Sequence, residues 1–138
     1  MIKFIFFATS PELFSQEISH IKSLLLTYNS EWAIITDKSQ LVLLAPELNK
    51  ESSVVILFAS SDKELEDLLE IKESFGAIPT VLVLPNDNTM TLQRGMMLHP
   101  LNFMAKHSGL NQYSVAVSEI YNIYEDHFHQ KRGYSSYH

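Results

Sequence analysis

With 138 residues, the chain has the length of one domain and can bury roughly two-thirds of the surface that its unfolded form would expose. Its 46% hydrophobic and 19% charged residues are typical of a globular protein and argue against an intrinsically disordered one. The sequence has no cysteine, which excludes disulfides, a thiol nucleophile and cysteine-ligated zinc, and its net charge of -6 disfavours a nucleic-acid-binding surface.

The N-terminal segment is apolar from Phe4 to Ala8, which is too short for the hydrophobic region of a signal peptide. No later segment approaches the length of about 20 apolar residues that a membrane-spanning helix needs. We therefore expect a cytoplasmic protein with no membrane partner. It is predicted to have one domain, residues 1–130, followed by a C-terminal tail, residues 131–138.

The first strand and the first helix are predicted from adjacent patterns. The unbroken apolar run from Ile2 to Ala8 is typical of a buried strand. Ser10 can cap a helix that has Pro11 at its first position. One face of that helix is marked by apolar residues at spacings of four, three, four and three: Phe14, Ile18, Ile21, Leu25 and Tyr28.

The next stretch predicts a short strand and then an ambiguous segment. Trp32 to Thr36 suits the strand. In residues 37–52, leucines at helical spacing favour a helix that Pro46 should shorten or break. A hairpin strand at Leu41 to Ala45 is the alternative.

The middle of the chain predicts a third strand and helix. Val54 to Phe58 is apolar throughout, as in a strand covered on both faces. Ser61 and Glu64 have the spacing of a capping box, and Gly76 is suited to end the helix that they begin.

The last third of the chain repeats the alternation. Strands are predicted at Ile78 to Pro85 and Asn102 to Lys106, with a helix at Met90 to Leu98 between them. A long helix follows Gly109, and its sheet-facing stripe is predicted to hold Tyr113, Val117, Ile120 and Tyr124. Five alternating strands and helices favour an α/β fold with a five-stranded parallel sheet, helices on both faces and flavodoxin-like order.

The segment "NFMAKHSGL" carries a resemblance to a known family. Residues 103–107 are similar to the aromatic-apolar-x-Lys-Pro pattern that ends the fifth strand of receiver domains in bacterial two-component response regulators, with His107 in place of proline. Lys106 lies 46 to 48 residues beyond Phe58 to Ser60, about the family's interval between its phosphoacceptor and its lysine. The resemblance extends from Ile2 to about Phe128 and implies the three-layer receiver fold.

The chain departs from that family at the positions of the phosphorylation site. The resemblance implies acidic Mg²⁺ ligands after the first strand, an acceptor aspartate at the end of the third, a Thr or Ser after the fourth and a lysine after the fifth. The corresponding residues here are Thr9 and Ser10, then Phe58, Ala59 and Ser60, then Leu84, and finally Lys106, which alone keeps the family's residue.

These replacements predict a degenerate receiver, or pseudo-receiver, that is not an enzyme and holds no cofactor or metal. Magnesium in such sites needs carboxylate oxygens, and phosphoryl transfer depends on its charge. Ser60 has no histidine beside it in sequence to act as a base. Asp62 is interpreted as a helix-start carboxylate. His127 and His129 are two residues apart and share no helix face, so no metal site is expected there.

The predicted function is phosphorylation-independent signalling through a protein partner or a homodimer. In receivers the region from the fourth to the fifth helix is the usual dimer and effector surface, which corresponds here to the helix at residues 90–98 and the last helix. The candidate contact residues are Met97, Tyr121 and Phe128, because the last two are seven apart and share a second helical stripe.

Two alternatives stay open at this point. A small-anion or small-ligand sensor could use Thr9, Ser10, Ser60, Ser61 and Lys106, which should converge at the carboxyl end of the sheet. A flavodoxin-like enzyme is disfavoured because the first loop, "ATSPE", lacks the glycine of a phosphate-binding loop.

Overall fold

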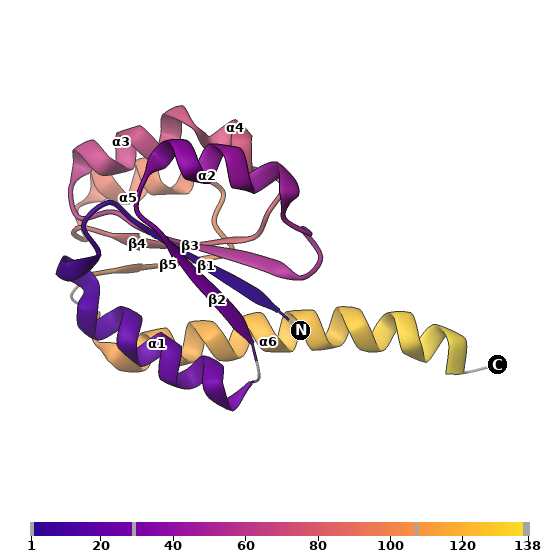
Figure 1. Ribbon diagram of the computed structural model, residues 1–138. Coiled ribbons are helices and arrows are strands. Elements are labelled where there is room, and N and C mark those ends of the chain that lie inside the picture. The colour runs from indigo at the N-terminus through magenta and orange to yellow at the C-terminus, as the bar shows by residue number, and fades with distance from the viewer. Residues whose placement is uncertain (1, 29, 107, 137–138) are drawn as a thin grey trace.

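The computed structural model describes residues 2–28, 30–106 and 108–136, with side chains as far as Tyr124. Its strands form one five-stranded parallel sheet in the order β2-β1-β3-β4-β5 (Figure 1). The strands are β1 Lys3–Ala8, β2 Glu31–Ile35, β3 Ser53–Phe58, β4 Thr80–Leu84 and β5 Asn102–Ala105. This is the strand order of the flavodoxin-like folds, so the predicted fold is confirmed.

Helices cover both faces of the sheet (Figure 1). The elements between the strands are η1 Pro11–Phe14, α1 Ser15–Thr27, α2 Lys38–Leu44, η2 Ala45–Glu47, α3 Asp62–Glu70, α4 Lys72–Phe75 and α5 Thr89–Met96. The last helix, α6 Leu110–Ser136, follows β5. α1 and α6 pack together on one face, and α2 to α5 lie on the other. In the part of the chain that the structure describes, no helix is long and apolar enough to cross a membrane.

Residues 37–52 contain the predicted helix, which is α2, and the alternative of a hairpin strand at Leu41 to Ala45 is wrong. The side chain of Asp37 caps α2 by accepting a hydrogen bond from the N–H of Ser39 at 2.7 Å. Leu41 is the buried residue of this helix. Pro46 ends the α-helical turn, as predicted, and lies within the 3₁₀ helix η2.

The first helix begins differently from its prediction. Pro11 opens the 3₁₀ turn η1, and α1 follows from Ser15. The Ser10 side chain makes no capping bond; its carbonyl instead accepts the N–H of Leu13 at 3.0 Å. The tight turn therefore depends on the backbone and on the fixed φ of proline.

Alternation along the buried strands divides the core into two layers. On β1, Phe4 and Phe6 face α1 and α6, whereas Ile5 and Phe7 face the helices of the opposite layer. Because both faces are covered, β3 is buried along its full length, as its apolar sequence predicts.

α6 packs as predicted along one stripe and also buries a second one. Tyr113, Val117 and Ile120 are buried, and the hydroxyl of Tyr124 donates to the carbonyl of Ser53 at 2.7 Å. Burial raises the pKa of Tyr124 to about 12 and raises the pKa of Tyr113 further, where the nearby Glu17 adds to the effect.

The prediction that Tyr121 is available to a partner is wrong. Only 6% of Tyr121 is exposed, because its ring stacks on that of Tyr28 at 3.8 Å and packs against Phe4. α6 contacts α1 as well as the sheet, so α1 and its C-cap residue Tyr28 cover the second stripe. The side chains of Phe128, His127 and His129 lie outside the described residues. The segment predicted as a tail from residue 131 is helical as far as Ser136, and α6 projects beyond the sheet (Figure 1).

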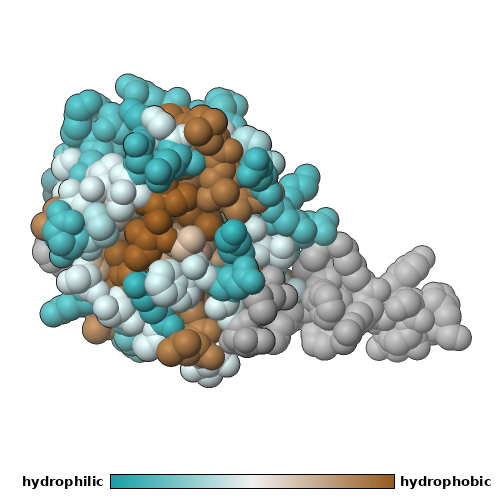
Figure 2. All heavy atoms as spheres, in the orientation of Figure 1, coloured by the Kyte–Doolittle hydropathy of each residue, from teal (hydrophilic) through white to brown (hydrophobic). Residues whose placement is uncertain are grey.

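The molecule carries apolar side chains on its surface near β2. Figure 2, in the orientation of Figure 1, shows an apolar band in the middle of the view where β2 lies in front, extending toward α2 and bordered by hydrophilic residues. The exposed hydrophobic residues of these elements and of α1 are Leu26, Trp32, Ile34 and Leu43.

Candidate functional site

The carboxyl ends of the strands bring the predicted site positions to one edge of the sheet. The last residue of β1, Ala8, pairs with Phe58 at the end of β3, which in turn pairs with Val83 on β4. On the far side, Leu84 pairs with Ala105, the residue before Lys106. The resemblance therefore aligned the correct strand ends.

Phe58, the first of the three residues predicted for the acceptor position, has a buried aromatic ring. Only 1% of the residue is exposed, and its ring lies 4.9 Å from the ring of Phe14 and 6.4 Å from that of Phe6. The Nζ of Lys106 lies 5.2 Å from the centre of the Phe14 ring, within the range of a cation–π interaction. The predicted lysine and the predicted acceptor position are thus connected through Phe14, a contact that the sequence pattern does not reveal.

The two residues after Phe58 have structural roles. Ala59 is buried against the opposite layer and donates its N–H to the carbonyl of Val83 at 2.9 Å. The N–H and the hydroxyl of Ser60 both donate to the carboxylate of Glu64, at 2.9 and 2.6 Å. The expectation that Ser60 lacks a neighbouring base needs correction, because Glu64 lies within hydrogen-bond distance. Each oxygen of that carboxylate accepts a bond at the start of α3, so the arrangement is that of a helix cap.

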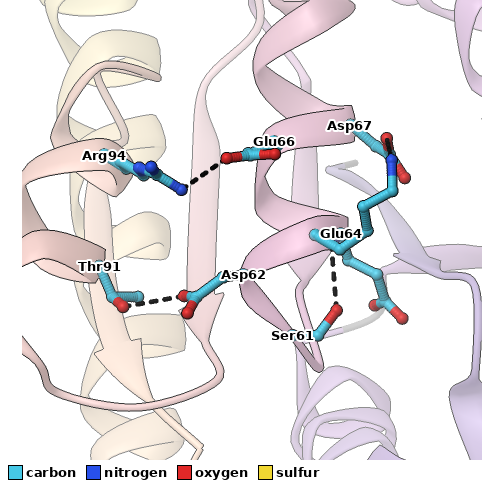
Figure 3. Close-up of polar contacts among 8 residues, drawn as sticks. Ser61, Asp62, Glu64, Glu66, Asp67, Thr91 and Arg94 are labelled. Carbon is cyan, nitrogen blue, oxygen red and sulfur yellow. Dashed lines mark hydrogen bonds and ion pairs between the residues drawn. The ribbon is translucent and has the colours of Figure 1, made fainter.

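The predicted capping box is confirmed at Ser61 and altered at Glu64. The hydroxyl of Ser61 accepts the N–H of Glu64 at 3.2 Å, as a capping box requires (Figure 3). The carboxylate of Glu64 reaches back to Ser60 and not to Ser61, one residue earlier than in the standard motif.

Leu84, at the position of the family's switch residue, is fully buried against α5. A Cβ atom added to Gly95 of α5 would lie 2.9 Å from Cδ2 of Leu84 and 3.0 Å from Cδ2 of Leu82. The absence of a side chain at Gly95 is therefore what lets α5 approach the end of β4 so closely.

Two polar contacts attach α3 to α5. Figure 3 shows Asp62 and Glu66 directed toward α5, where the Thr91 hydroxyl donates to Asp62 at 2.9 Å and Arg94 pairs with Glu66 at 2.6 Å. Asp62 is the first residue of α3, which agrees with its interpretation as a helix-start carboxylate.

A small pocket lies at the crevice between β1 and β3, where the strand order of the sheet reverses. Its volume is about 130 Å³, and it is lined by Phe7, Thr9, Lys38, Phe58, Glu64, Asp67 and Leu68. Crevices of this kind hold ligands in related folds, but most small-molecule sites are larger, at roughly 300 Å³ or more. Two carboxylates against one ammonium disfavour an anion, and Lys106 does not line the pocket. Among the described residues, no group of three or more His, Asp or Glu is placed to hold a metal.

Exposed apolar residues lie on the edge strand β5 and on α5 and α6, the helices before and after it in the chain; we call this set of residues the β5 face. Asn102 on β5 donates to Glu119 on α6 at 2.9 Å, which places the side of α6 that carries Glu119 next to β5. The exposed apolar residues here are Met96 and Met97 at the end of α5, Leu101 and Phe103 at β5, and Val115 and Ile123 one helical turn on either side of Glu119. Met97, a predicted contact residue, is 52% exposed. Phe103, which the sequence pattern placed only in the lysine motif, is 42% exposed on the edge strand β5.

The sequence matches no known protein-family model and no curated protein. The structure is similar to that of a protein assigned to pilus assembly (cpaE) from Burkholderia thailandensis, with a TM-score of 0.61 and 8% identity over 86% of this chain and 97% of the other. A signal receiver domain of a modulated diguanylate cyclase from Desulfovibrio desulfuricans has a TM-score of 0.62 and 12% identity over 89% and 95% of the two chains. A pilus assembly-related protein from Burkholderia pseudomallei has a TM-score of 0.64 and 11% identity over 86% and 88%. The chain therefore has a receiver-like fold.

Proposed function

We propose that this chain is a cytoplasmic bacterial signalling module that functions without being phosphorylated and acts by binding another protein, not as an enzyme. The observation that carries the proposal is the aromatic packing beneath Lys106. A phosphoacceptor site needs a carboxylate that faces solvent and further oxygen atoms for Mg²⁺. The three residues predicted for the acceptor position, Phe58, Ala59 and Ser60, supply no carboxylate, and the ring of Phe58 is buried against Phe14.

The remaining positions of the site support the same proposal. Lys106 interacts with the face of Phe14, which gives it a structural role independent of a phosphoryl group. Leu84 fills the space between β4 and α5. A hydroxyl at the switch position of a receiver could form a hydrogen bond with a phosphoryl group. The side chain of Leu84 cannot form such a bond, and it is packed against Gly95.

The β5 face is the surface that we propose for the partner. Its exposed methionine, leucine and phenylalanine side chains suit the centre of a protein interface, and the hydrogen-bonded pair of Asn102 and Glu119 adds a polar contact among them. The outward N–H groups of β5 already have acceptors: the Asn102 side chain for Phe103 at 2.8 Å, and the Ser108 hydroxyl for Ala105 at 3.1 Å. The partner would therefore be bound through side chains and not by strand addition.

Incubation with acetyl phosphate and Mg²⁺ is expected to leave the chain unphosphorylated, because Phe58, Ala59 and Ser60 provide no carboxylate at the acceptor position. Beryllofluoride should likewise leave the amide NMR spectrum unchanged. A receiver domain that takes up phosphate under the same conditions serves as the positive control. A labile acyl phosphate that disappears in Asp62→Asn, or an acid-stable phosphate ester that disappears in Ser60→Ala, would contradict the proposal.

Charged substitutions on the β5 face are expected to abolish capture of the partner from a lysate of the source organism. Phe103→Glu and Met97→Glu each place a charge at the apolar centre of the proposed interface, so the dissociation constant should rise roughly tenfold or more. Leu13→Glu is a matched control, because Leu13 is 48% exposed on η1 and is not one of the residues of this face. A partner retained by both β5 variants, with native circular dichroism, would show that binding occurs elsewhere.

A further inference from the structure

The two edges of the sheet differ in how their backbone groups are satisfied. At β5, side chains of Asn102 and Ser108 accept the outward N–H groups, as described above. Such local capping is one way in which proteins prevent an edge strand from pairing with another chain. The opposite edge, β2, has no comparable protection among the described residues.

The register of β2 shows which of its backbone groups point outward. The N–H of Glu31 donates to the carbonyl of Ile2, so Glu31, Ala33 and Ile35 face β1. In a parallel strand the residues between them direct both N–H and C=O to the other side. Trp32 and Ile34 therefore present two donors and two acceptors at the edge, and none of these has a partner within the described ranges 2–28, 30–106 and 108–136.

The side chains at this edge are apolar and already ordered. Trp32 is 42% exposed, and Ile34, which points to the same face of the sheet, is 37% exposed. The centre of the Trp32 ring lies 6.2 Å from that of Phe6, in a T-shaped arrangement, and 4.1 Å from the ammonium of Lys22. Part of the apolar band in Figure 2 lies over this strand. A fixed apolar strand with free backbone groups is suited to pairing with another strand.

We propose that two copies of the chain associate through β2, which pairs with itself in antiparallel orientation about a two-fold axis at Ala33. In that register Trp32 lies opposite Ile34 of the other copy, and both residues direct their N–H and C=O groups across the interface. Four backbone hydrogen bonds then form without disturbing the bonds between β2 and β1. The small side chains of Ala33 meet at the centre, where cross-strand residues come closest.

Side-chain pairing and charge favour a second copy as the occupant. Each Trp32 would contact an Ile34, which is an aromatic and β-branched pair of the kind that stabilises antiparallel strands. Glu31 would lie opposite Ile35, so no like charges face each other across the strands. The charged residues on and beside the strand, Lys3, Lys22 and Lys38 against Glu31 and Asp37, sum to +1, whereas the chain carries a net charge of -6. Two copies can thus meet at this edge without the repulsion expected elsewhere.

The resulting dimer would contain a continuous sheet of ten strands with a β5 face at each end. This inference goes beyond the proposed partner binding and does not rest on it, because the two surfaces lie at opposite edges of the sheet. Isologous pairing of one patch with itself also gives a closed dimer, not a filament.

Sedimentation velocity of the full chain, from micromolar to near-millimolar concentration, tests the proposal. We expect the mass to rise from monomer to dimer. Trp32 is the single tryptophan, so its fluorescence should become less accessible to acrylamide over the same range. Ile34→Lys should raise the dimer dissociation constant roughly tenfold or more, because each copy would bring a charge against Trp32 of the other.

The matched control is Phe103→Lys on the opposite edge, where exposure is 42%, and it should leave dimerisation unchanged. Ile34→Pro is a second variant, because it removes both an outward N–H and the Ile34 side chain but none of the bonds between β2 and β1, and it should likewise weaken the dimer. Amide exchange of the unmodified chain requires no substitution: protection at Trp32 and Ile34 should increase with concentration, and protection at Phe103 should not. A chain that stays monomeric, or a dimer that forms without this protection, would overturn the proposal.

Discussion

Phe58→Asp is expected to unfold the domain instead of restoring a phosphoacceptor. The substitution removes a ring that packs on Phe14 and Phe6 and is 1% exposed. Loss of a buried phenylalanine costs about 3–5 kcal/mol, and an unpaired buried carboxylate adds a further penalty. The total approaches the whole stability of a small domain, which is about 5–15 kcal/mol.

Urea denaturation followed by circular dichroism measures this effect. Phe58→Leu is the matched variant, because it keeps an apolar side chain at the same site and should cost less than half as much. Phe103→Asp introduces the same carboxylate at an exposed position of the sheet edge and should change the free energy of unfolding by about 0.5 kcal/mol or less. A Phe58→Asp protein that is stably folded and takes up phosphate would mean that the site retains its chemistry, and the proposed function would be wrong.

The sequence was sufficient to predict the fold because each strand and helix carries a strong local pattern. The apolar runs of β1 and β3 are typical of strands that are covered on both faces of a sheet, and these strands are buried along nearly their full length. The choice between helix and strand in residues 37–52 stayed open because it depends on one side-chain hydrogen bond. The N–H of Ser39 donates this bond to the carboxylate of Asp37. Proline at position 46 is equally compatible with the end of a helix and with a turn.

Periodicity could not predict which helical stripes are covered. The spacing in α6 identifies Tyr113 and Tyr121 as members of two different stripes, and both are buried. The covering element for the second stripe is α1, whose C-cap residue Tyr28 is 93 residues away from Tyr121 in sequence. No local pattern contains such information, so Tyr121 was assigned to a partner surface that it does not reach.

The sequence predicted that the residues of the candidate site lie at the ends of strands, but it did not predict which side chains they contact. Alignment of strand ends located Phe58, Leu84 and Lys106, since the carboxyl ends of parallel strands meet at one edge. Phe14 was recognised only as one member of a helix face, although it contacts both Phe58 and Lys106. The bond from Thr91 to Asp62 likewise joins two helices across 29 residues of sequence.

Gly95 is the other residue whose importance depends on a distant contact. It lies in α5, where a glycine ordinarily weakens a helix by about 1 kcal/mol relative to alanine. Its backbone faces Leu82 and Leu84, whose methyl groups occupy the space that a side chain would need. Both leucines are fully buried and cannot withdraw without displacing their neighbours in the core.

Gly95→Val is therefore expected to lower the free energy of unfolding by about 2–3 kcal/mol, because the branched side chain would force α5 away from β4. Gly95→Ala should change stability by less than about 1 kcal/mol, since the gain in helix propensity opposes the contact of one methyl group with Leu84. Met96→Val, at the next and 39% exposed position, controls for a β-branched residue in the same helix and should cost less than about 1 kcal/mol. Thermal and urea denaturation would measure all three. Equal stability of Gly95→Val and the unmodified chain would mean that α5 can move away from Leu84 at little cost, and that the end of β4 is free to act as a switch after all.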